Sequence, residues 1–167
     1  VTSIGSSAFY DCNGLTGVSI SDIASWCKIS FDVSSSNPLS YAKKLYLNGE
    51  LVTDLVIPEG VTSIGKYAFD GCASLTSVTI PSSVTSIGSS AFEDCSSLTS
   101  VTIPEGVTSI GSLAFYGCNN FKNITLHSKC PPDLEFDAFD HCSSLCFFLP
   151  VESESAYLTA HPWCEFA

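Results

Sequence analysis

Apolar and polar residues along this chain follow a pattern that repeats every 23 residues. Near-identical segments begin at Val61, Val84 and Val107, and each carries the frame V-T-S-I-G-x-x-A-F-x-x-C-x-x-[LF]-x-x-[VI]-x-[IL]. A fixed period in the twenties is typical of a solenoid, in which each repeat forms one coil. One coil cannot bury its apolar face alone, so the hydrophobic core should run through a stack of coils.

Each repeat predicts two short extended segments and one tight helical turn. The segment 77–80 alternates polar and apolar residues, which is typical of a half-buried strand. Ile87-Gly88 is a second, shorter extended segment, and Phe92 and Cys95 lie three residues apart on one face of a turn. Stacking should place each Val, Ile, Phe and Cys over its equivalent in the next coil.

The regular spacing breaks after the first unit. Val1 and Val61 begin equivalent units but lie 60 residues apart, which is 37 more than one period, so we expect an insertion over about 21–51. In that segment Ser21-Asp22 is a good N-cap for a short helix over 23–27. Pro38 favours the start of a second helix, and Asn48-Gly49 between apolar residues predicts a hairpin turn.

The fold expected from this pattern is a right-handed, mostly β solenoid of about five coils in a single domain, 1–167. It has a parallel sheet on one face, short helical turns, the inserted helix-hairpin segment and a C-terminal helical cap over 151–167. In the cap, Trp163 and Phe166 should cover the last coil. The chain lacks Met and opens within a repeat, so we expect earlier residues to be missing from it. The expected repeats are about 1–20, 52–80, 81–103, 104–126 and 130–150.

Charge argues against several classes of partner. The chain of 167 residues has 17 acidic and 6 basic residues, all six of them Lys, for a formal charge of −11. Nucleic-acid-binding proteins normally present a basic stripe with Arg on phosphate or guanine, so we expect no nucleic acid as partner. The longest apolar runs fall short of the roughly 18 residues that a membrane-spanning helix needs, so we expect no membrane insertion.

The nine cysteines do not read as a disulfide framework. Five occupy the same place in successive repeats, which favours a column of buried thiols: Cys12, Cys72, Cys95, Cys118 and Cys142. The others include Cys130, Cys146 and Cys164, with His127 and His161 close by in the sequence. The alternatives to free thiols there are a disulfide among these three cysteines or a zinc site formed with the histidines. A zinc site needs four converging ligands, and the leading expectation is no metal and no cofactor.

The sequence holds no catalytic motif. There is no G-x-S-x-G elbow, no G-x-G-x-x-G and no P-loop. His and Cys come together only near the C-terminal end, without an evident third group to orient them. An acidic run at Asp133, Glu135, Asp137 and Asp140 lacks the central Gly of a calcium loop and is typical of a solvated surface. We therefore expect no enzymatic activity.

The frame L-x-x-V-T-I-P-x-x-V-T-S-I-G-x-x-A-F-x-x-C resembles the BspA-like leucine-rich repeat (LRR_5-type). The resemblance is close over 1–20 and 52–126 and looser over 130–150. It implies a leucine-rich-repeat solenoid in a secreted or cell-surface protein of host-associated bacteria or some parasitic protists. It also implies adhesion, since members of this family bind host matrix proteins or other bacteria. The resemblance transfers no binding or catalytic residue to this sequence.

Two groups of residues are candidates for binding a protein or glycan. One is the outward face of the sheet, where uncharged side chains with hydroxyl or amide groups should lie: Ser77, Thr79, Ser100, Thr102, Asn123 and Thr125. The other comprises the aromatic residues of the expected insertion: Trp26, Tyr41 and Tyr46. The alternative is that Ser and Thr only solvate a β-surface and that the aromatic residues pack the insertion onto the solenoid.

These observations predict a non-enzymatic binding or adhesion module that recognises a host or microbial protein or glycan. The alternative function is a structural spacer, whose coils have no ligand and only hold other parts of a larger surface protein. Exposure of the aromatic residues separates the two. Full burial of all three and a sheet face of hydroxyls alone would favour the spacer.

Overall fold

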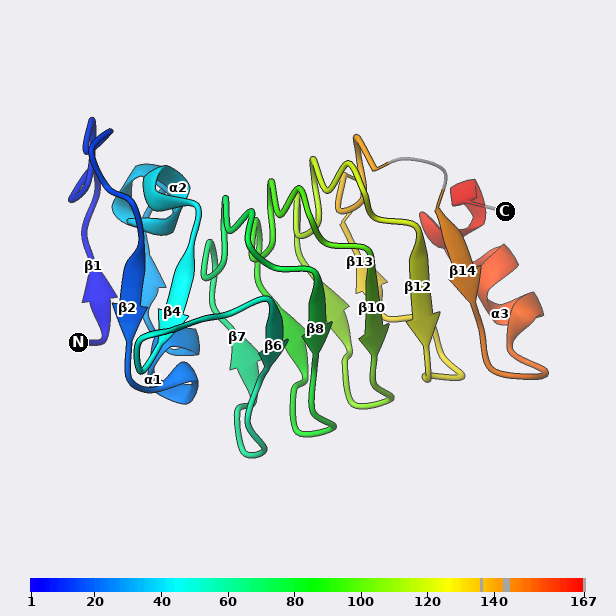
Figure 1. The fold of residues 1–167 in the computed structure, drawn as a ribbon. Helices are drawn as coiled ribbons and strands as arrows, with labels where there is room; N and C mark the ends of the chain where they lie inside the picture. The colour runs from blue at the N-terminus through cyan, green and yellow to red at the C-terminus, as the bar shows by residue number, and fades with distance from the viewer. Residues whose placement is uncertain (136, 143–144, 167) are drawn as a thin grey trace.

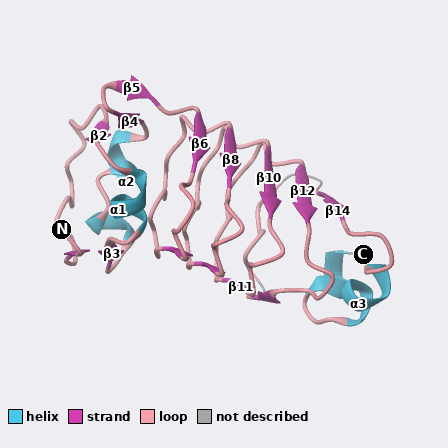
Figure 2. Ribbon diagram, turned by 90° about the horizontal axis from the view of Figure 1, so that it is seen from below, coloured by secondary structure: helices cyan, strands magenta, loops and turns pink. Residues whose placement is uncertain are grey.

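The computed structural model describes residues 1–135, 137–142 and 145–166, which wind into an elongated stack of coils (Figure 1). Two parallel sheets lie on opposite sides of the core (Figure 2). The main sheet has the strand order β14-β12-β10-β8-β6, and the opposite sheet has the order β13-β11-β9-β7. This solenoid of stacked parallel strands confirms the fold class that the repeat predicts.

Each regular coil contributes one strand to each sheet. The main sheet consists of β6 (Asp54–Val56), β8 (Ser77–Thr79), β10 (Ser100–Ile103), β12 (Asn123–Leu126) and β14 (Cys146–Phe148). The opposite sheet consists of β7 (Ser63–Ile64), β9 (Ser86–Ile87), β11 (Ser109–Ile110) and β13 (Asp133–Leu134). Residues one period apart pair directly, as Val78 does with Val101. The repeat therefore sets the register of both sheets.

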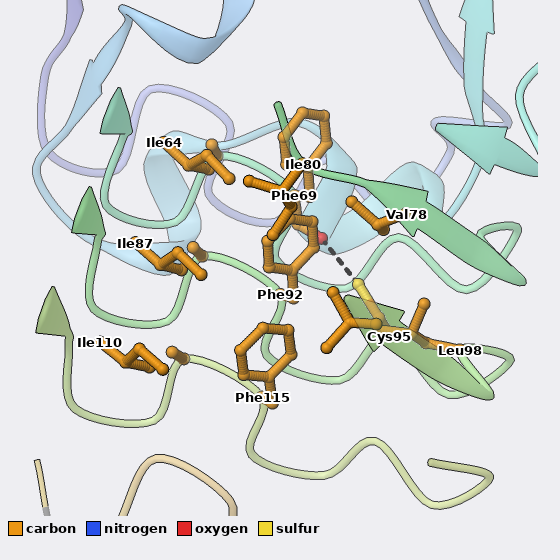
Figure 3. Packing of buried hydrophobic residues seen from close by; sticks show 14 of the residues in the cluster. Ile64, Phe69, Val78, Ile80, Ile87, Phe92, Cys95, Leu98, Ile110 and Phe115 are labelled. Atoms are coloured by element: carbon orange, nitrogen blue, oxygen red, sulfur yellow. Dashed lines mark hydrogen bonds between the residues drawn. The ribbon is translucent and has the colours of Figure 1, made fainter. Parts of the chain in front are cut away.

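A column of phenylalanine rings fills the space between the sheets. Figure 3 shows Phe69, Phe92 and Phe115 stacked in a row, with Ile87 and its equivalents on one side and Val78 on the other. Ring centroids in this row are 5.3 Å apart, and the planes of neighbouring rings differ by 9° or less. All three rings are fully buried. Stacked aromatic pairs stabilise a core beyond the effect of their buried area, so the column links consecutive coils.

The repeat cysteines link the coils through hydrogen bonds as well as through packing. Three of these thiols donate to a phenylalanine carbonyl one coil earlier, at 3.1–3.2 Å: Cys95 to Phe69, Cys118 to Phe92 and Cys142 to Phe115. The expected column of buried free thiols is confirmed for Cys72, Cys95 and Cys118. Cys12 and Cys142 are only half-buried.

Much of the expected insertion over 21–51 is itself a coil, which corrects the expected coil number from five to six. β1 (Ser3–Ile4) pairs in parallel with β3 (Ser30–Phe31), and β2 (Val18–Ile20) pairs in parallel with β4 (Leu45–Leu47). Paired residues such as Ser3 and Ser30 lie 27 positions apart, rather than 23. The repeat pattern does not reveal this coil, because two short helical segments, 34–36 and 39–42, stand where the regular coils have A-F-x-x-C.

The local elements predicted for this segment are confirmed. Helix α1 (Ile23–Cys27) begins after Asp22, whose carboxylate accepts hydrogen bonds from two N–H groups of the first turn. A 3-10 turn η1 (Ser34–Ser36) and helix α2 (Leu39–Ala42) follow, and Pro38 precedes α2. β5 (Glu50–Leu51) then pairs antiparallel with β4. Their turn uses Asn48 and Gly49, both at positive φ, as a tight hairpin requires.

The C-terminal cap is also confirmed. Helix α3 (Glu154–Thr159) and the 3-10 helix η2 (Trp163–Phe166) lie over the last coil (Figure 1). Trp163 is 5% exposed, and its ring lies 6.2 Å from that of Phe139, measured between centroids. Its indole N–H donates to the Pro132 carbonyl at 2.7 Å. The cap thus shields the last aromatic ring of the column from water.

Replacing Phe92 with Ala should lower the free energy of unfolding by about 3–5 kcal/mol, because it empties one position of a fully buried column. Urea denaturation followed by circular dichroism measures the difference. Phe148→Ala is the control, since Phe148 is 54% exposed and should change stability by less than about 1 kcal/mol. Equal effects of the two substitutions would show that the column does not carry the stability of the stack.

Thiol titration at mildly alkaline pH should separate the cysteines into two classes. Cys130 and Cys146 are exposed and should react at once, whereas the buried column cysteines Cys72, Cys95 and Cys118 should react only on unfolding. Burial raises the pKa of Cys142 to about 11 and that of Cys118 further, so little nucleophilic thiolate forms there. Mass spectrometry after short labelling identifies the modified residues. Rapid labelling of Cys95 in the folded protein would contradict the stacking.

Candidate binding surface

The outward face of the main sheet brings the six hydroxyl and amide residues predicted from the sequence into two adjacent rows. Strand register aligns each row across all five strands. The first row, from β6 to β14, is Asp54, Ser77, Ser100, Asn123 and Cys146. The second row is Val56, Thr79, Thr102, Thr125 and Phe148. With neighbouring strands about 4.8 Å apart, the rows extend over about 19 Å.

Several hydroxyls on this face have no partner within the described part of the chain. None of the hydrogen bonds there uses the side chains of Ser100, Thr102 or Thr125. Threonines beside the sheet behave differently. Thr76 Oγ1 and Thr99 Oγ1 donate to the backbone carbonyl one coil earlier, at 3.1 and 3.2 Å. The solenoid therefore uses the hydroxyls next to the sheet for its own stability and leaves those of Ser100, Thr102 and Thr125 on the outward face without a partner in the described chain.

The two ends of the second row are apolar and exposed. Val56 is 62% exposed and Phe148 is 54% exposed, whereas the residues between them are threonines. Neither was a candidate binding residue at the level of the sequence. The signal for Val56 was present, because it alternates with the inward-facing Leu55. The outward position of Phe148 depended on the pairing of β14 with β12, which the sequence of the last unit did not decide.

The three aromatic candidates of segment 21–51 do not form one surface. Trp26 is only 6% exposed, and its indole N–H donates to the Ala68 carbonyl at 2.8 Å. In the regular coils a phenylalanine N–H donates to this carbonyl position, as Phe69 does to Ala91. Trp26 thus replaces a missing backbone donor, which makes it a structural residue of the core.

Tyr41 and Tyr46 remain half-buried. Tyr46 lies on β4, with its ring over Gly17, where a Cβ atom would come within 2.6 Å of the ring. Tyr41 lies on α2 and on neither strand of its coil. Neither belongs to the two rows of the main sheet, so the sheet face and these tyrosines are separate candidates.

A buried carboxylate holds the irregular coil against the next one. Asp70 is 4% exposed and accepts hydrogen bonds from the hydroxyls of Ser34 and Ser40, at 2.5 and 2.6 Å. Asn37 adds a further link, since its side-chain amide donates to the carbonyls of Tyr67 and Ala68. Burial raises the pKa of Asp70, while the two serine hydroxyls and the charge of Lys43 oppose the rise.

The described residues form no metal-binding cluster, no disulfide and no membrane-spanning helix. No group of three or more His, Cys, Asp or Glu side chains there converges to hold a metal ion. All nine cysteines are free thiols, including Cys130, Cys146 and Cys164. None of the described helices has both the length and the apolar character to cross a bilayer.

Asp70→Asn should raise the thermal stability at pH 7 and lose this advantage as the pH falls. A raised pKa means that the folded state binds the proton more tightly than the unfolded state. The wild type is therefore destabilised above the folded-state pKa, and this penalty disappears below the unfolded-state value, about pH 3.9. Melting temperatures of both proteins between pH 3 and 8 measure the effect. A less stable variant at pH 7 would mean that the serine hydrogen bonds outweigh the cost of burial.

Comparison with known proteins gives a family and two similar structures. The model of the BspA type leucine rich repeat region matches residues 1–50 and 39–161, with six copies. A leucine-rich repeat protein from Eubacterium ventriosum has 24% identity and a TM-score of 0.57, covering 90% of this chain and 52% of its own. A leucine rich cell surface protein from Faecalibacterium prausnitzii has 25% identity and a TM-score of 0.48, covering 93% and 54%.

This chain spans about half the length of those two proteins. The curated proteins include no match to the sequence. The family model covers nearly the whole chain, and its six copies agree with the six coils of the structure. The chain belongs to the BspA-type leucine-rich-repeat family.

Proposed function

We propose that this chain is a non-enzymatic binding module that docks a protein or glycan on the outward face of its main sheet. The observation that carries the proposal is the pair of in-register rows, whose unpaired hydroxyls lie between the exposed side chains of Val56 and Phe148. Hydroxyls both donate and accept hydrogen bonds, so they suit the polar groups of glycans and of protein main chains. The two apolar ends add area that binding would remove from water.

The rigidity of the face supports the same proposal. The central strands β8, β10 and β12 each pair with a neighbouring strand on both sides, and their inward side chains are buried. A partner therefore docks on a surface that loses little conformational freedom, which favours affinity. We also propose that the module acts in a secreted or cell-surface protein, as the family resemblance implies, and that adhesion is its role.

A structural spacer is the second candidate function, and the burial of Trp26 favours it. In this role the coils only separate other parts of a longer protein. Two features speak for binding instead: the tyrosines of segment 21–51 are not fully buried, and the sheet face includes the exposed apolar residues Val56 and Phe148. The two functions differ in whether the isolated chain binds any ligand.

Thr102→Arg should weaken ligand binding at least about tenfold, because a long charged side chain at the centre of the face blocks close approach. The assay is a binding screen of the purified chain against arrays of extracellular-matrix proteins and glycans, followed by titration of each ligand found. Thr62→Arg is the matched control, since Thr62 is an exposed threonine outside the main sheet.

Ligands that bind the wild type and the Thr62 variant but not the Thr102 variant would support the docking face. Equal binding by both variants would place the ligand elsewhere on the molecule. A screen without any ligand would favour the spacer.

A further inference from the structure

The hairpin of segment 21–51 interrupts the series of strands and leaves a groove. β5 is the last strand of the sheet β2-β4-β5, and β6 is the last strand of the main sheet. In Figure 2, β5 runs from β4 toward β6 along the outside of the stack. A groove of about 520 Å³ lies at this junction. Its lining consists of Ile23 and the residues 47–48 and 50–56.

One wall of this groove is an unused strand edge. On its other side β6 pairs with β8, where the Ser77 N–H donates to the Thr53 carbonyl and the Ile57 N–H donates to the Thr79 carbonyl. In a parallel ladder, alternate residues of a strand direct their main-chain groups to opposite sides. Asp54 and Val56 therefore direct theirs toward the groove, where no strand of the described chain pairs with them.

The groove also exposes apolar side chains next to this edge. Val56 is 62% exposed and Leu51, on β5, is 44% exposed. An unpaired strand edge bordered by exposed apolar residues is a template for a further strand. An extended segment there gains main-chain hydrogen bonds from the edge and places alternate side chains against the apolar lining.

Charge selects the occupant. The groove is lined by two carboxylates, Glu50 and Asp54, and by no basic side chain. The Ser77 and Thr53 hydroxyls donate to Asp54 at 2.6 and 3.0 Å and lower the pKa of this carboxyl, so it stays negatively charged near neutral pH. The whole chain carries a formal charge of −11. A cationic segment is complementary to this site, and an acidic one is repelled.

We propose that the groove between β5 and β6 binds an extended basic polypeptide segment, in which apolar residues alternate with Lys or Arg and which adds to the free edge of β6 as a strand. The groove shares Asp54 and Val56 with the β6 end of the outward rows. The free main-chain edge of β6 plays no part in the docking function proposed for those rows, so this proposal does not depend on that function. Its specificity has two sources: main-chain pairing with β6 requires an extended backbone, and the carboxylates require basic side chains.

The test uses a fluorescein-labelled, N-acetylated peptide of about seven residues that alternates Lys and Val, and that spans about 23 Å when extended. Fluorescence anisotropy against the whole chain should show saturable binding. A peptide that is N-methylated at every internal residue cannot donate main-chain hydrogen bonds from either edge, and a peptide with Glu in place of Lys has the wrong charge. Both should bind at least about tenfold more weakly.

Protein variants locate the site. Asp54→Lys should weaken binding of the Lys-Val peptide at least about tenfold and should restore binding of the Glu-Val peptide. The matched control is Ser100→Lys, since Ser100 occupies the same row two strands away, and it should change binding less than about twofold. Hydrogen exchange should slow at the Val56 amide when the Lys-Val peptide is bound.

Three results would overturn the proposal: no saturable binding of the Lys-Val peptide, equal binding of the N-methylated peptide, or an equal loss in the Ser100 and Asp54 variants. Thermal melts of both variants confirm that each is folded before titration. Thr102→Arg should leave peptide binding unchanged, because Thr102 lies outside the groove lining. Failure of this proposal is therefore distinguishable from failure of the docking function proposed for the main sheet.

Discussion

The structure depends on one constraint: each coil must satisfy the main-chain groups and cover the apolar face of the next. Strand pairing does this in both sheets, and the connecting turns do it through individual bonds. The Phe92 N–H donates to the Ala114 carbonyl, and the Cys118 thiol donates to the Phe92 carbonyl. Since the regular coils repeat these bonds at the same positions, their 23-residue period follows from the hydrogen bonding as much as from the packing.

The irregular coil shows what happens when the period is broken. With 27 residues between paired strands, its backbone no longer presents a donor to the Ala68 carbonyl, and the side chains of Trp26 and Asn37 donate instead. The buried carboxylate of Asp70 also joins this coil to the next one, because it accepts hydrogen bonds from two serines of the irregular coil. Trp26 was a candidate for ligand binding at the level of the sequence, and its place in the core is explained by the Ala68 carbonyl, which lacks a backbone donor.

The two proposed binding surfaces consist of groups that this bonding does not use. On the main sheet these are the outward hydroxyls of β10 and β12, with exposed apolar residues at both ends of their row. In the groove between β5 and β6 the unused groups are main-chain groups of β6, and two carboxylates lie beside them. The first surface suits polar groups of many partners. We propose that the second is more selective, because pairing with β6 requires an extended backbone and the carboxylates favour a positively charged segment.

The sequence by itself determined the regular coils. Inward and outward residues of 52–126, the thiol column, the Asn48-Gly49 turn and the C-terminal cap all follow from local pattern and turn chemistry. Only the tertiary structure decided that segment 21–51 includes a sixth coil, that Trp26 faces the core, and that β6 has a free edge over a groove. The physical reason is the distance along the chain between the residues that interact. The hydrophobic pattern of a strand and the residues of a turn are local, so the sequence shows them. The pairing of Ser3 with Ser30 and the bond from Trp26 to Ala68 join residues far apart in the chain, and no local pattern marks them.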